Sequence, residues 1–88
     1  RQKNTLVMLK TYVMIKNRHH IVSELEMFIE SFNHEYQSAG NEIKVYLDHA
    51  EVYIIINESI DIYEPSNTKP YSFSNLNDAI NKLNSIFS

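Results

Sequence analysis

The residues from Ile43 to Pro65, IKVYLDHAEVYIIINESIDIYEP, constrain the fold more than any other part of the chain. Apolar side chains alternate here with polar or aromatic ones in three short runs, which the polar connections DHAE and NES separate. Alternation with a period of two is typical of strands that have one buried face, and connections this short join antiparallel neighbours. The stretch therefore predicts a three-stranded antiparallel meander.

Two segments outside the meander have the spacing of amphipathic helices. The first helix is expected from about Ser23 to Gln37, because Ser23 opens an S-x-x-E capping box and Gly40 can end the helix. The last helix is expected to begin after Ser74 or Asn75. The apolar stripes consist of Leu25, Phe28, Ile29, Phe32 and Tyr36 in the first helix, and of Leu76, Ile80, Leu83 and Phe87, flanked by Ala79 and Ile86, in the last.

The amino-terminal segment, residues 1–22, allows two interpretations. Its core, TLVMLKTYVMIK, is rich in Thr, Val, Ile and Tyr, which favours a strand, but its alternation is poor. Apolar or aromatic residues also recur every seven positions from Met8 to Tyr36, and no Gly or Pro occurs before Gly40. This second pattern favours one long helix from about Thr5 to Gln37, so the pattern leaves helix and strand open.

These elements predict a single small α+β domain of 88 residues. Its order is α-β-β-β-α, and the YSF run at 71–73 can add a short fourth strand at the edge of the meander. A one-sided sheet and two one-sided helices bury their apolar faces when both helices pack on the same side of the sheet. We expect residues 23–88 to form the core and residues 1–22 to form a basic, apolar amino-terminal segment.

The strand register brings three tyrosines together on the face away from the expected core. Pairing Tyr46 with Tyr53, and Tyr53 with Tyr63, keeps every core residue inside, whereas a one-residue slip would not. Beside the tyrosines lies a second row of Lys44, Ile55 and Asp61. Cross-strand aromatic pairs stabilise a sheet by themselves, and the amino-terminal segment could also cover them. If the face stays open, it is a surface for docking a protein partner.

Positive charge is concentrated in the first 20 residues, which hold five Lys or Arg and no acid. The other residues hold three Lys and all eleven acids, so the two parts carry charges of +5 and −8. The simpler interpretation is that the basic part complements the acidic body of this chain or of a second subunit. The alternative is nucleic-acid binding by Lys3, Lys10, Lys16 and Arg18 together with the sheet tyrosines.

Residues needed for catalysis or metal binding show no informative spacing. There is no Cys, the single Gly excludes glycine-rich phosphate loops, and the four His form no HExxH pattern. No apolar run approaches the roughly 18–20 residues of a membrane helix. We therefore expect a cytoplasmic, non-enzymatic module without cofactor, metal or membrane contact.

The amino-terminal segment is also more apolar than a free tail should be. We expect it either to complete the fold or to form a homodimer seam. The seam residues would be Leu6, Leu9, Val13 and Ile15.

Overall fold

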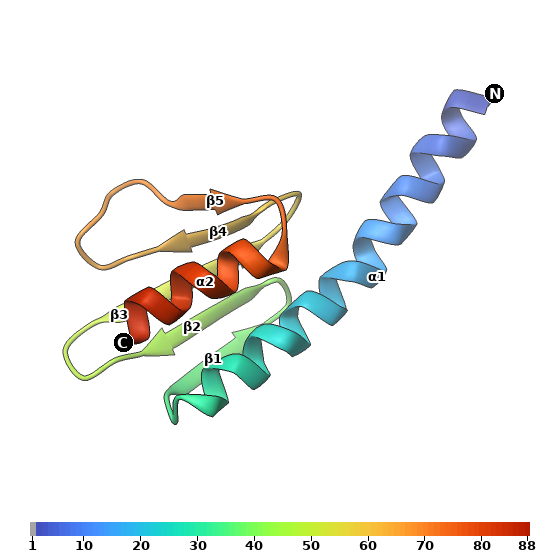
Figure 1. Cartoon of the computed structure of the whole chain (residues 1–88). Helices are drawn as coiled ribbons and strands as arrows, with labels where there is room; N and C mark the ends of the chain where they lie inside the picture. The colour runs from blue at the N-terminus through green and yellow to red at the C-terminus, as the bar shows by residue number, and fades with distance from the viewer. Residues whose placement is uncertain (1) are drawn as a thin grey trace.

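Five antiparallel strands form one sheet, and two helices pack on the same face of it (Figure 1). A computed structural model describes the backbone of residues 2–88 and the side chains of residues 17–88. The elements are α1 (Gln2–Ser31), β1 (Glu35–Ala39), β2 (Glu42–Tyr46), β3 (Glu51–Ile56), β4 (Ile60–Tyr63), β5 (Tyr71–Phe73) and α2 (Leu76–Phe87). The strands lie side by side in chain order. The predicted α+β meander is confirmed, with five strands where three or four were expected.

The helix α1 contains 30 residues and extends well beyond the sheet (Figure 1). At 1.5 Å per residue its length is about 45 Å, which accounts for most of the 52 Å long dimension of the molecule. Its carboxyl-terminal part packs on the sheet, where Leu25 and Ile29 are fully buried. The amino-terminal segment is therefore helical. Because the helix runs through Ser23, the predicted helix start at that residue is wrong.

α1 ends earlier than predicted because Asn33 adopts a left-handed backbone conformation, with φ of 60°. The amide of Asn33 donates to the carbonyl of Glu30 at 2.9 Å, and the amide of His34 donates to the carbonyl of Ile29 at 3.5 Å. These two hydrogen bonds define the Schellman helix end, in which Asn can replace Gly. Residues 35–37 were expected to complete the helix, and they belong instead to β1, so Tyr36 lies on a strand.

Gly40 forms the turn between β1 and β2, so its predicted role at the end of a helix is wrong. Its φ is 61°, and only Asn41 separates it from β2. A two-residue hairpin loop with positive φ at its first residue is a type II′ turn, for which Gly is the favoured residue. The turn pairs Ala39 with Glu42 and thereby sets the register of the first hairpin.

The core lies between the inner face of the sheet and the two helices. Alternate residues of the middle strands are buried, which confirms the predicted period of two. The buried residues are Ile43, Val45, Val52, Ile54, Ile56, Ile60 and Ile62 from the sheet, and Leu25, Ile29, Ala79 and Leu83 from the helices. At one end of this core, Phe28 and Phe32 of α1 meet Phe87 of α2, with ring centroids 5.2–6.2 Å apart.

α2 begins where the sequence predicts. Asn75 caps it, because its side-chain oxygen accepts a hydrogen bond from the amide of Asp78 at 2.9 Å. Further along the helix, the ammonium group of Lys82 lies 3.1 Å from the carboxylate of Glu64 and 3.9 Å from the ring centroid of Tyr71. The hydrogen bond to Glu64 raises the pKa of Lys82, and both contacts attach α2 to the end of the sheet formed by β4 and β5.

The pairing of β2 with β3 differs from the prediction by two residues. Tyr46 lies opposite Glu51, and Tyr53 lies opposite Lys44, so the predicted pairing of Tyr46 with Tyr53 is wrong. A shift of two residues leaves every side chain on its own face, and the alternation therefore fits both registers equally well. The predicted pairing of Tyr53 with Tyr63 is confirmed.

Ile54 and Ile55 are neighbours in β3 that face opposite sides of the sheet, and they provide a matched test of the fold. Ile54→Ala removes a side chain with no exposed area and should lower the free energy of unfolding by about 2–5 kcal/mol. Ile55→Ala, on the outer side and half-buried, should cost about 1 kcal/mol or less. Urea denaturation followed by circular dichroism measures both losses. Equal losses would contradict the assignment of the two faces.

Candidate functional site

The outer face of the sheet is the side away from both helices (Figure 1). Among residues 2–88, no segment crosses this face, because the amino-terminal half of α1 leads away from the sheet. All six residues predicted for partner binding lie on it, together with six residues that were not among the predicted site residues. The outer face comprises Tyr46, Tyr53, Tyr63, Lys44, Ile55 and Asp61, together with Glu35, Gln37, Ala39, Glu42, Glu51 and Ser72.

The strand register arranges the outer face in three cross-strand rows. The central row is Gln37, Lys44, Tyr53 and Tyr63, one side row is Glu35, Tyr46 and Glu51, and the other is Ala39, Glu42, Ile55, Asp61 and Ser72. Tyr46 therefore lies diagonally from Tyr53, and the three tyrosines form a bent line instead of the straight row expected. Diagonal neighbours on a sheet remain within reach of aromatic side chains, so the tyrosines still form one surface.

Lys44 connects the side chains at the centre of the outer face. Its ammonium group lies 3.1 Å from the carboxylate of Glu51 and 5.4 and 5.6 Å from the ring centroids of Tyr46 and Tyr53. At these distances a cation is attracted to an aromatic ring. The hydroxyl of Tyr53 donates to Glu51 at 2.9 Å, and that of Tyr46 donates to Gln37 at 2.9 Å. These contacts fix the orientation of the aromatic side chains, and a surface fixed in this way loses less entropy in any binding event.

The same contacts shift two pKa values. The hydrogen bond from Tyr53, followed by that from Lys44, holds the pKa of Glu51 below its ordinary value of 4.5. The hydrogen bond with Glu51 raises the pKa of Lys44 above 10.5. Both groups are therefore charged at neutral pH. Because the pair is exposed to solvent, its main consequence is the orientation of Lys44, with little effect on stability.

A shallow groove of about 590 Å³ borders the outer face along β1, which has a neighbouring strand on one side only. The groove is lined by His34, Glu35, Tyr36, Gln37 and Tyr46. The hydroxyl of Tyr36 donates to the carboxylate of Glu30 at 2.5 Å, which raises the pKa of Tyr36 to about 12 and ties β1 to α1. Through Gln37 and Tyr46 the groove is continuous with the outer face, so one partner can contact both.

The basic residues predicted for nucleic-acid binding belong to a different element from the tyrosines. Lys3, Lys10, Lys16 and Arg18 all belong to α1, which packs on the inner side and then leads away from the sheet (Figure 1). The side chains of the first three, and of the seam residues Leu6, Leu9, Val13 and Ile15, lie outside the described residues. On the outer face itself, four carboxylates surround one lysine, which disfavours contact with phosphates.

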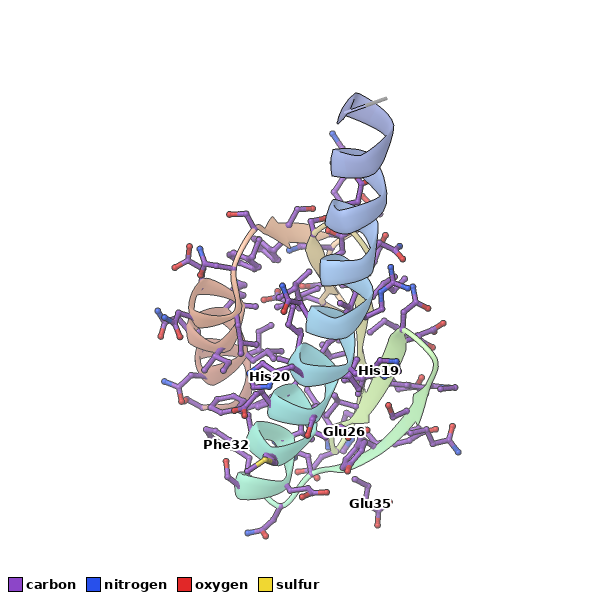
Figure 2. All side chains as sticks on the ribbon, turned by 90° about the vertical axis from the view of Figure 1, so that its right-hand side faces the viewer. His19, His20, Glu26, Phe32 and Glu35 are labelled. Carbon is purple, nitrogen blue, oxygen red and sulfur yellow. The ribbon has the colours of Figure 1, made fainter. Side chains whose placement is uncertain are left out.

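The histidines are dispersed over the molecule. His19 and His20 are exposed and point in different directions from α1 (Figure 2). His34 packs against Phe87, with ring centroids 4.7 Å apart, and His49 lies in the turn between β2 and β3. Within the described part of the chain, no three His, Asp or Glu side chains are close enough to hold a metal ion. None of the helices described is both long and apolar enough to cross a membrane.

Comparison with protein-family models, with curated protein sequences and with solved structures finds no match to this chain. The outer face is therefore interpreted from its own geometry. Sequence reasoning missed Glu51 and Gln37 as members of the site. The signal for Glu51 was present, because it precedes Tyr53 by two residues and must share its face. Gln37 had been assigned to a helix.

The hydrogen bonds around Glu51 predict a specific titration. In carbon-detected NMR, the Glu51 carboxyl should titrate below pH 4.5 and should shift upward in both Tyr53→Phe and Lys44→Met. Because the folded state lowers the pKa of Glu51, the ionised carboxylate stabilises the protein at pH values above the unfolded-state pKa. This stabilisation is lost as the pH falls through the folded-state pKa. Lys69→Met changes an exposed lysine in the loop before β5 and is the control. An unchanged Glu51 titration in both variants would show that these contacts do not form.

Proposed function

We propose that the outer face docks another protein and that this chain is a non-enzymatic interaction or regulatory module. The observation that supports this proposal is the uncovered sheet face with three half-buried tyrosines and Ile55 at its centre. Tyrosine supplies a rigid contact surface with an apolar body and a polar tip, and it is enriched at protein interfaces. The lack of Cys is consistent with the reducing cytoplasm that we propose as its location.

The charges of the outer face indicate the chemistry of the partner. Glu35, Glu42 and Asp61 lie at its margins, and the only lysine is paired with the fourth carboxylate, Glu51. The margin is therefore acidic, whereas the centre is aromatic and aliphatic. A complementary partner presents an apolar or aromatic centre within a basic margin, and such charges accelerate and orient the encounter.

The size of the surface indicates how the partner binds. Five strands about 4.8 Å apart and about five residues long present roughly 400 Å², about half of what each partner buries in a standard interface. A stable complex therefore needs more contact area than the sheet face provides. The groove along β1 is the adjoining surface, and its edge strand can pair with an extended segment. We propose that the partner contacts the outer face and this groove together.

Capture from a native extract tests the proposal when matched variants are compared. Immobilised wild-type chain, Tyr53→Ala and Ile55→Glu are exposed to the extract, and Lys69→Glu serves as the control for a charge change away from the face. Quantitative mass spectrometry should find a protein that the wild type and the control retain and that both outer-face variants lose by at least about tenfold, as expected for residues at an interface centre. Urea denaturation should show that Tyr53→Ala remains folded.

Two results would contradict the proposed function. The first is the recovery of the same proteins by the wild type and both outer-face variants. The second is binding of labelled RNA or DNA that weakens steeply between low and high salt and is insensitive to Tyr53→Ala. Such binding would indicate phosphate contacts by the basic residues of α1.

A further inference from the structure

The amino-terminal half of α1 is a helix that lies beyond the sheet of its own chain (Figure 1). Of residues 2–16, eight are apolar or aromatic: Leu6, Val7, Met8, Leu9, Tyr12, Val13, Met14 and Ile15. At 3.6 residues per turn these positions are distributed around the whole helix. Helices that are apolar on all sides are normally buried, and isolated helices of this length are marginal in water. This half of α1 therefore needs a partner that the fold of one chain does not supply.

The carboxyl-terminal half of α1, which packs on the sheet, indicates where that partner lies. Its side away from the core carries Met27, which is 60% exposed. His20 precedes it by seven residues and is exposed as well (Figure 2). Further steps of seven residues along the same side of the helix lead from His20 to Val13 and Leu6, and Leu9 lies beside these two positions. One helix side thus joins apolar positions of the amino-terminal half to the exposed Met27.

We propose that two copies of the chain associate through this side, with their α1 helices antiparallel. A two-fold axis between positions 16 and 17 sets Leu6 opposite Met27 of the second copy, and Val13 opposite His20 of the second copy. Each contact then occurs twice, as in other two-fold interfaces. This pairing includes three of the four predicted seam residues, whereas the helical period places Ile15 on the other side of the helix. The inference does not depend on the outer face, because α1 packs on the opposite side of the sheet.

The distribution of charge determines the direction of the pair. Every charged residue of α1 up to Arg18 is basic, and those that follow are Glu24, Glu26 and Glu30. Antiparallel pairing sets the basic half of each helix beside the acidic half of the other, with Lys10 next to Glu24 of the second copy. Parallel pairing would set like charges side by side, which is unfavourable. A second copy therefore provides both the apolar cover and the complementary charge.

Disulfide crosslinking tests the arrangement, because the chain contains no Cys of its own. Leu6→Cys and Met27→Cys are prepared separately with tags of different mass and then mixed under mild oxidation. Along one helix the two positions are about 31 Å apart, far more than a disulfide spans, so neither variant should crosslink efficiently by itself. The mixture should give a crosslinked heterodimer. A mixture of Leu6→Cys with Lys69→Cys, which lies in an exposed loop, is the control.

Charge reversal provides a second measurement in the full chain without Cys. In sedimentation equilibrium, Lys10→Glu and Glu24→Lys should each weaken dimerisation by about tenfold, because each change affects two symmetry-related pairs. The variant that carries both Lys10→Glu and Glu24→Lys should dimerise as strongly as the wild type. The proposal would be overturned if the chain were only monomeric at millimolar concentration or if Leu6→Cys crosslinked efficiently with itself. It would also be overturned if neither charge reversal changed the dimerisation constant. Binding to anionic lipid vesicles without dimer formation would also overturn it.

Discussion

Burial of the aliphatic inner face of β2, β3 and β4 is the interaction on which the rest of the structure depends. Seven isoleucine and valine side chains form this face, and α1 and α2 cover it together. Burying a side chain of this kind fully contributes roughly 1.5–3 kcal/mol of favourable free energy, so the inner face supplies most of the hydrophobic stabilisation of the fold. Because both helices pack against one face, the other face remains available for tyrosines, charges and contact with another molecule.

The two proposed interfaces lie on different parts of the molecule and are compatible. The outer face is ordered by the contacts of Lys44 with Glu51 and two tyrosine rings, whereas the proposed dimer contact uses the far side of α1. A dimer formed through α1 would therefore carry two free outer faces. Two linked binding sites increase the apparent affinity for a partner that is itself multivalent, which would compensate for the small area of each face.

The sequence predicted β2, β3 and β4 and their faces because alternation reports burial directly, and it predicted α2 because the cap at Asn75 is local. It could not determine the register of β2 with β3, since a two-residue shift preserves every face. It misplaced the end of α1 because two residues, Asn33 and Gly40, can both adopt a left-handed conformation, and Tyr36 fits either a helix or a strand. The groove along β1 was missed for the same reason, since β1 was expected to be helical. The six residues proposed for partner binding were predicted on one surface. Glu51 could have been added from its spacing to Tyr53, whereas Gln37 required β1 to be recognised as a strand.

Exposure of Tyr53 to a soluble paramagnetic compound tests most directly whether the outer face is open. NMR spectra of the dilute protein would compare the ring signals of Tyr53 and Tyr63 with the methyl signals of Val45 and Ile54. If the outer face is open, the tyrosine signals should broaden strongly, while the signals of the two residues buried under the helices keep their intensity. Protection of Tyr53 equal to that of Ile54 would contradict the account, because it would mean that another segment covers the outer face.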